Sequence, residues 1–226
     1  MITTTEKIEY INQLNFFKSL NTTELEKLSK FSKITTYPKS SMLYYENDEH
    51  SKIFFLISGL IKVYKIDKYE NEIFLYHIHK NSLISELTTI DNDSIFCFSN
   101  TEFVEDGTIL EVDFSELKKQ FLSKNMLNNE FIQEILLKMQ QLHCVVNREL
   151  VFDATSKVAF MLGNDLEIFN KLKRQEVSFM LHIQPETLSR VLKKLKRSAV
   201  IEVIHSQVKV LNSVKLRSIY SSSNSI

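Results

Sequence analysis

The most regular hydrophobic pattern in the chain lies between residues 174 and 204. Four apolar residues recur there at positions i, i+3, i+4 and i+7: Leu188, Val191, Leu192 and Leu195. This spacing predicts a helix with one apolar face, and Pro185 marks its first turn, where proline is tolerated. A shorter helix at Arg174–Leu181 and a turn at 182–184 precede it. The segment therefore predicts a helix-turn-helix.

The first turns of the second predicted helix carry polar side chains on the face opposite the apolar one. They are Glu186, Ser189 and Arg190. Arginine can donate to guanine O6 and N7, glutamate can accept from the cytosine amino group, and serine can do either. We therefore predict that these three residues contact base edges. The simpler alternative is an ordinary two-helix corner with a charged, solvated face.

Other residues of the same predicted helix suit the DNA backbone. We expect phosphate contacts from Thr187, Lys193, Lys194 and Arg197. After the helix, Ile201–Ile204 and Val208–Leu211 alternate in polarity around a polar turn at 205–207. This pattern predicts two short strands, the wing of a winged helix, whose tip commonly meets phosphate.

The distribution of charge favours DNA over the simpler alternative. The whole chain is neutral, with 28 basic and 28 acidic residues. Residues 171–226 carry 11 Lys and Arg against three acidic residues, a net charge of +8, which leaves −8 for residues 1–170. A basic C-terminal module on an acidic body is expected when only one end of a chain contacts phosphate.

The region from residue 33 to 113 is rich in Ile, Phe, Tyr and Val and is interrupted by short polar turns. This pattern predicts an antiparallel barrel or sandwich. Within it, residues 53–58 and 60–64 form two apolar runs joined at Gly59, where we expect positive φ. A helical segment near Thr22–Ser32 is predicted to pack against this barrel. Nothing in the region resembles a catalytic site.

A long helix is predicted between the barrel and the basic module, at about Lys124–Leu150. Its apolar residues step by three and four, as in a two-stranded coiled coil: Ile132, Ile135, Met139, Leu142 and Val146. We call these five residues the helix seam and predict that they form a homodimer. The alternative is a single amphipathic helix on its own barrel. Phe131, Leu136 and Leu137 widen the apolar face enough for both arrangements.

Composition limits the possible classes of protein. The chain has 226 residues, 43% hydrophobic and 25% charged, typical of one large or two modest globular domains. We find no apolar run of membrane-spanning length and no signal peptide, so we expect a cytoplasmic protein. Two cysteines exclude a disulfide scaffold, and neither a phosphate-binding glycine loop, a metal motif nor a catalytic motif is present. We therefore do not expect an enzyme.

The order of these parts resembles the Crp/Fnr family of bacterial transcription regulators over nearly the whole chain. The resemblance is carried by residues 57–64, by Phe152 and Asp153 at a hinge, and by the Glu-x-x-Ser-Arg pattern that starts at Glu186. It implies an α+β fold with three parts. They are an N-terminal antiparallel β-roll similar to cyclic nucleotide-binding domains (1–123), a dimerisation helix and hinge (124–152), and a winged helix-turn-helix (153–226).

The same resemblance implies what the protein reads. The Glu-x-x-Ser-Arg pattern is typical of the Fnr-like branch and implies a half-site similar to TTGA in an inverted repeat. Glu186 and Arg190 would then read the C·G pair, and Ser189 a neighbouring thymine. Pro185 departs from the pattern of the Crp-like branch and leaves the outer bases open. RNA polymerase is a partner that the family implies.

The resemblance also argues against two effectors. Members that bind cyclic AMP have Gly-Glu-Leu followed by Arg-Ser, whereas this chain has Ser85, Glu86 and Leu87 followed by Asp93 and Ser94. An aspartate beside the phosphate would be unfavourable, so we do not expect cyclic AMP to bind. The adenine-contacting pair of such members is replaced by residues 142–143. An iron–sulfur cluster needs four cysteine thiolates, and two cannot supply them.

Haem, a redox thiol, another small ligand or no ligand remain as possibilities. The groups that could ligate haem iron are His77, His79, His143 and Cys144. Each also has a simpler interpretation, since a pair of strand histidines is usually solvated and Cys144 can be a small apolar filler. Cys97 lies in an apolar run and is more typical of an inert core thiol than of a sensor.

Two functions from different classes follow. The first is a dimeric, sequence-specific DNA-binding regulator. The second is a ligand- or haem-binding β-roll sensor whose C-terminal helices serve oligomerisation only. They differ in what Arg190 does, because only the first places its guanidinium on a base.

Overall fold

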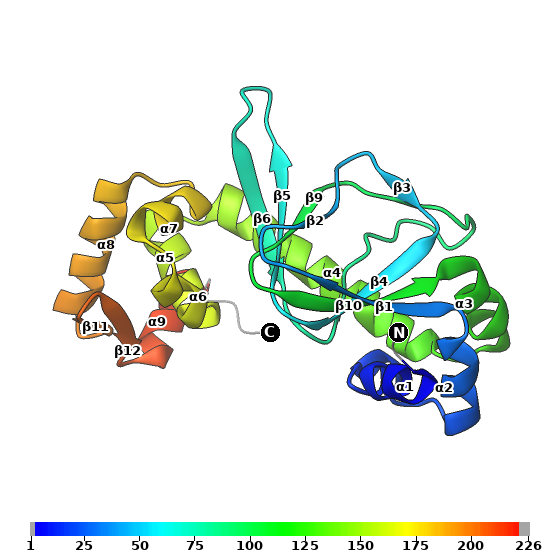
Figure 1. Cartoon of the computed structure of the whole chain (residues 1–226). Coiled ribbons are helices and arrows are strands. Elements are labelled where there is room, and N and C mark those ends of the chain that lie inside the picture. Colours follow the sequence, from blue (N-terminus) through cyan, green and yellow to red (C-terminus); the bar gives the residue numbers. More distant parts are fainter. Residues whose placement is uncertain (1–2, 222–226) are drawn as a thin grey trace. The chain divides into compact units, whose positions relative to one another are not determined.

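The computed structural model describes residues 3–221 and divides into two compact units between Leu142 and His143 (Figure 1). The first unit is built from antiparallel sheets with helices packed on them, and the second is mainly helical. The predicted α+β class is therefore confirmed. Among residues 3–221, no helix combines the length and the apolar character that a membrane crossing requires.

Two four-stranded antiparallel sheets form the β-roll of the first unit. The first has the order β1 (Ser32–Tyr37), β10 (Gly107–Asp113), β4 (Lys52–Ser58) and β7 (Ser82–Leu83). The second has the order β2 (Met42–Tyr44), β9 (Asn100–Phe103), β5 (Ile61–Ile66) and β6 (Glu72–Ile78). A short pair, β3 (Glu49–His50) with β8 (Ile95–Phe96), completes the roll. The predicted antiparallel region is confirmed.

Gly59 joins β4 to β5 but does not make a hairpin. The two strands belong to different sheets, so the chain passes from one sheet to the other at this residue. The predicted positive φ is confirmed at +96°. A Cβ at Gly59 would lie 2.7 Å from the Cα of Gly107, so a side chain there would meet backbone that cannot move aside. Close approach and left-handed geometry both require glycine.

Short helices cover the β-roll. They are α1 (Thr4–Asn12), the 3₁₀ turn η1 (Asn15–Phe17), α2 (Thr22–Ser29), α3 (Phe114–Gln120) and the 3₁₀ turn η2 (Leu122–Lys124). The helix predicted at 22–32 is confirmed as α2, which ends sooner because the chain enters β1. Helix α1 was not expected. Phe16 and Phe17 place their rings 4.8 and 5.0 Å from that of Phe55, in the core under these helices.

The long helix α4 spans Asn128–Val146 and begins later than predicted. Asn125 and Leu127 have positive φ, 59° and 63°, which breaks the helix before Asn128. Phe131 is buried in the core of the first unit, whereas Leu136 and Leu137 are each about half exposed. After Val146 the chain continues as one π-helical turn, η3 (Asn147–Val151).

The second unit begins with α5 (Ala154–Asn164), which Asp153 caps by accepting from the Ser156 N–H at 2.7 Å. The elements that follow are α6 (Leu166–Lys171), α7 (Arg174–Met180), α8 (Pro185–Arg197), β11 (Ile201–Ile204), β12 (Gln207–Val210) and α9 (Ser213–Tyr220). Phe160 contacts Phe152 and Tyr220 at ring distances of 5.6 and 5.3 Å, which holds α5 and α9 together.

The predicted helix-turn-helix and hairpin are both present, with one shift. Ile204 pairs with Gln207, so the turn contains only His205 and Ser206 rather than three residues. Both turn residues have positive φ, 47° and 70°, as a two-residue type I′ turn requires. The second strand consequently starts at Gln207, one residue earlier than predicted.

Candidate functional site

Helix α8 separates its apolar and polar residues onto two faces. Leu188, Val191 and Leu195 are buried against the second unit. Glu186, Ser189 and Arg190 are exposed together at the start of the helix. The structure thus brings the three predicted base-reading residues onto one solvent-facing surface. Their donors and acceptors are free to meet a groove from that surface.

The cations further along α8 form a second part of this surface. Lys193, Lys194 and Arg197 are exposed and, with Arg190, surround a shallow hollow. Positive charge is therefore continuous from the base-reading residues to the end of the helix. Thr187, which was also predicted to contact phosphate, is half-buried. Its side chain is thus less available than those of the three cations.

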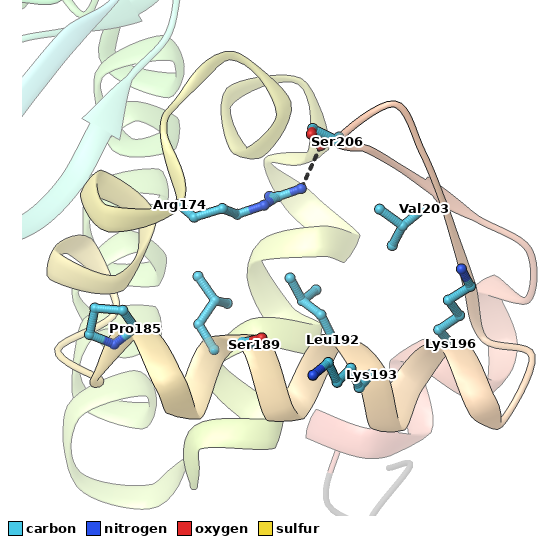
Figure 2. A pocket seen from close by; sticks show the side chains of 9 residues that line it. Arg174, Pro185, Ser189, Leu192, Lys193, Lys196, Val203 and Ser206 are labelled. Atoms are coloured by element: carbon cyan, nitrogen blue, oxygen red, sulfur yellow. Dashed lines mark hydrogen bonds between the residues drawn. The ribbon is translucent and has the colours of Figure 1, made fainter.

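A groove of about 340 Å³ lies between α8 and the wing (Figure 2). Arg174, at the start of α7, reaches across it and donates from Nη2 to the Ser206 carbonyl at 2.6 Å. Its guanidinium also lies 4.5 Å from the centre of the Phe169 ring, and burial lowers the pKa of Arg174. Arg174 therefore ties the wing tip to the helix-turn-helix. Sequence reasoning missed this role, although the position opens the first helix.

A separate pocket of about 260 Å³ lies in the first unit, between the β-roll and α4. Two charged residues, Glu86 and Lys138, line it. Most of the other lining side chains are apolar: Tyr76, Leu83, Leu87, Phe98, Ile135 and Leu142. Ser85, Glu86 and Leu87, singled out from the sequence, therefore do line a pocket. Leu142 closes it where cyclic AMP-binding relatives were expected to carry a polar residue.

The polar groups of this pocket are already engaged with the protein. Lys138 Nζ donates to the Ile84 carbonyl at 3.1 Å, and loss of water lowers the pKa of Lys138 to about 8. Glu86 accepts from the Phe98 N–H and the Ser99 hydroxyl, both at 2.9 Å. Glu134 on α4 accepts from the Leu83 N–H at 3.1 Å. Glu134 is not among the lining residues, so one carboxylate and one cation line the pocket, and both already have partners in the protein.

Asp93 does not have the position that the sequence comparison suggested. Its carboxylate is exposed and pairs with Lys118 Nζ at 2.6 Å, outside the residues that line the pocket. The argument that a buried, uncompensated Asp93 repels a phosphate is therefore wrong. The pocket itself is lined by one carboxylate, Glu86, and one cation, Lys138, and none of the arginines within residues 3–221 lines it.

The four possible haem ligands are not found together as one metal-binding cluster within residues 3–221. His77 lies in β6 and His79 directly after it, with ring centres 6.4 Å apart. His143 is exposed and Cys144 half-buried, both in the second unit. Within residues 3–221 no cluster of three or more His, Cys, Asp or Glu side chains is arranged to hold a metal ion.

The two cysteines should differ in reactivity. Cys97 is 2% exposed, and burial raises the pKa of its thiol to about 12. The thiolate is the reactive form, so Cys97 should resist alkylation. We expect iodoacetamide at pH 8 to label the half-buried Cys144 at least about tenfold faster in the folded protein. Peptide mass spectrometry measures this ratio. The prediction would be contradicted if Cys97 and Cys144 were alkylated at the same rate in the folded protein and unfolding did not speed the alkylation of Cys97.

Two family models match the chain. The cyclic nucleotide-binding domain matches residues 34–124, and the Crp-like helix-turn-helix domain matches residues 153–219. Among curated proteins, the anaerobic regulatory protein of Bacillus subtilis (strain 168) is 20% identical over 192 residues, which is 80% of each chain.

Solved structures share the fold. FixK2 from Bradyrhizobium japonicum superposes with a TM-score of 0.69 at 15% identity, covering 85% of this chain and 99% of its own. A mutant of CooA from Carboxydothermus hydrogenoformans superposes with a TM-score of 0.65 at 19% identity, covering 85% and 89%. Both likenesses concern the fold, because sequence identity is low.

Proposed function

Because the chain belongs to the Crp/Fnr family of transcription regulators, we propose that it is a homodimer that binds an inverted repeat similar to TTGA. The observation that carries this proposal is the joint exposure of Glu186, Ser189 and Arg190 at the start of α8. As a transcription regulator, the protein is not an enzyme. The same family membership supports RNA polymerase as a partner.

The proposed contacts follow from the chemistry of each side chain. Arg190 donates twice to the guanine of TTGA, Glu186 accepts from the cytosine amino group of the same pair, and Ser189 contacts a neighbouring thymine. Lys193, Lys194 and Arg197 neutralise phosphates and supply affinity without sequence preference. Pro185 shapes the first turn and so influences the outer bases.

The proposed dimer rests on the exposed face of α4. In a single chain the five seam residues are all exposed, between 44% for Ile135 and 55% for Ile132. A helix face this apolar and this exposed is typical of a subunit interface. A two-fold axis along the seam would present two copies of α8 to half-sites about 34 Å apart.

We further propose that the protein does not respond to cyclic AMP. In the described part of the chain no arginine lines the pocket, Lys138 already donates to the Ile84 carbonyl, and Leu142 is apolar, so the pocket is a poor site for a cyclic phosphate. A haem or another small ligand would act, if at all, by changing how the seam packs. A sensor whose C-terminal helices only mediate oligomerisation is less favoured, because oligomerisation does not require exposed Glu186 and Arg190.

A fluorescence anisotropy titration at fixed salt tests the proposal. The labelled duplex carries the inverted TTGA repeat, and the control duplex carries the same bases in scrambled order. We expect the repeat to bind at least about 1,000-fold more tightly, the lower end for specific DNA-binding proteins, with no change on adding cyclic AMP. Equal affinity for both duplexes would contradict the proposed function, and tighter binding with cyclic AMP would contradict the proposed lack of response.

A further inference from the structure

Glu149 links the turn after α4 to α5 and to the turn of the helix-turn-helix, all within the second unit. It lies in the π-helical turn η3, directly after the dimerisation helix α4. Its Oε2 lies 2.9 Å from His182 Nδ1, in the turn of the helix-turn-helix, and 3.3 Å from Lys157 Nζ on α5. Its Oε1 accepts from Arg148 Nε at 2.6 Å. We call Glu149 and these three partners the hinge cluster.

The hinge cluster consists of ion pairs whose two cations are buried. Arg148 and Lys157 are each only 8% exposed. Burial alone would raise the pKa of Glu149, but the hydrogen bonds from His182 and Arg148 lower it to about 2. Glu149 is therefore a carboxylate at any physiological pH. Removing its charge would leave two buried cations without this partner, which is costly.

His182 has a backbone conformation that is unfavourable for residues other than glycine. Its φ is +50°, in the left-handed region where glycine is favoured. The residue stands three positions before Pro185, where α8 begins. Its N–H donates to the Phe179 carbonyl at 3.0 Å, which closes the end of α7. The imidazole at this strained position is used to contact Glu149.

The backbone around Glu149 is also unusual. Five residues, Asn147–Val151, form a π-helical turn between α4 and α5. Single π-helical turns are frequent at functional sites. Here the turn places Glu149 toward the helix-turn-helix while Val146, the last seam residue, stays exposed one turn earlier. The hinge cluster therefore joins the turn that follows the last seam residue to the turn that precedes α8.

We propose that Glu149 is a positioning residue that fixes the direction of α8 relative to the end of the dimerisation helix. In a dimer, that direction determines the distance between the two copies of α8. Glu149 and His182 would thus determine which separation of half-sites the protein accepts, without contacting DNA. This inference rests on the proposed function, and it adds a determinant of operator spacing to it.

Two variants remove the link in different ways. Glu149→Gln keeps the shape of the side chain and removes its charge. His182→Gly removes the imidazole and places at this position the residue that best tolerates positive φ, so this variant should still fold. The matched control is Glu167→Gln in the same unit, where an exposed pair with Lys171 at 2.9 Å is lost. Such exposed pairs contribute little.

The readout is anisotropy with inverted TTGA repeats whose half-site separation is shortened or lengthened by one or two base pairs. A duplex with a single half-site measures the affinity of one α8 for its bases, independently of half-site separation. We expect the wild type and Glu167→Gln to prefer one separation. In Glu149→Gln and His182→Gly we expect this preference to fall by about tenfold, the effect of one charge-assisted hydrogen bond. Single half-site affinity should change by less than about twofold in both.

The possible failures are distinguishable. If both folded variants keep the wild-type spacing preference, the inference is wrong and the proposed function stands. If Glu149→Gln does not fold, His182→Gly decides, because glycine tolerates the positive φ at this position. A wild-type protein that does not distinguish the repeat from scrambled DNA would overturn both the proposed function and the inference.

Discussion

Replacing Arg190 by alanine should abolish the preference for the inverted TTGA repeat while leaving the protein folded and dimeric. The side chain is exposed on α8 and makes no contribution to the core, so its loss removes only a DNA contact. A bidentate arginine–guanine contact provides about 1–3 kcal/mol of discrimination. With two half-sites the expected loss is roughly 30-fold to more than 10,000-fold in the ratio of specific to scrambled affinity.

Lys193→Ala is the matched control, because it removes a neighbouring exposed cation from the same helix. This variant should weaken specific and scrambled DNA alike and reduce the slope of affinity against salt by about one unit per half-site. Anisotropy titrations at several salt concentrations separate the two behaviours. An Arg190→Ala protein that still discriminates as the wild type does would contradict the base-reading role.

Met139→Glu should convert the protein into a monomer. Met139 is 50% exposed in the single chain and does not line the pocket between the β-roll and α4. A charge at this position should therefore be tolerated in the monomer. In a seam dimer the two glutamates would be buried together, at a cost of about 3–5 kcal/mol. The dimer dissociation constant should rise by roughly 100- to 1,000-fold or more, as measured by sedimentation equilibrium.

Gln140→Glu controls for the added charge, since Gln140 is exposed on α4 but is not part of the seam. It should remain dimeric. The monomeric Met139→Glu variant should also lose most of its affinity for the repeat. It should bind the repeat no more tightly than it binds a duplex with a single half-site. A dimeric Met139→Glu protein would show that the seam is not the interface.

Local patterns in the sequence predicted the helices of the DNA-binding unit well. The spacing of Leu188, Val191 and Leu195 and the position of Pro185 depend only on neighbours along one helix. The same local information predicted positive φ at Gly59. It could not predict that β4 and β5 belong to different sheets, because strand pairing is decided by residues distant in sequence such as those of β10.

In the candidate site, too, local patterns were predictable from the sequence and contacts between distant residues were not. Exposure of Glu186, Ser189 and Arg190 follows from the periodicity of α8, and the structure places them where that periodicity predicts. The Glu149–His182 contact joins residues 33 positions apart, and no spacing rule points to it. Asp93 was misplaced for a related reason, since its partner Lys118 lies on a separate helix that the sequence did not connect to the loop.

The central claim is that Arg190 at the start of α8 reads the guanine of each half-site. It is tested most directly by replacing that guanine with 7-deazaguanine, which removes only the N7 acceptor. The wild type should lose affinity for the modified repeat by about tenfold or more per half-site, whereas Arg190→Ala should bind modified and unmodified repeats equally. If the modified repeat weakens both proteins to the same extent, or neither of them, Arg190 does not read this base.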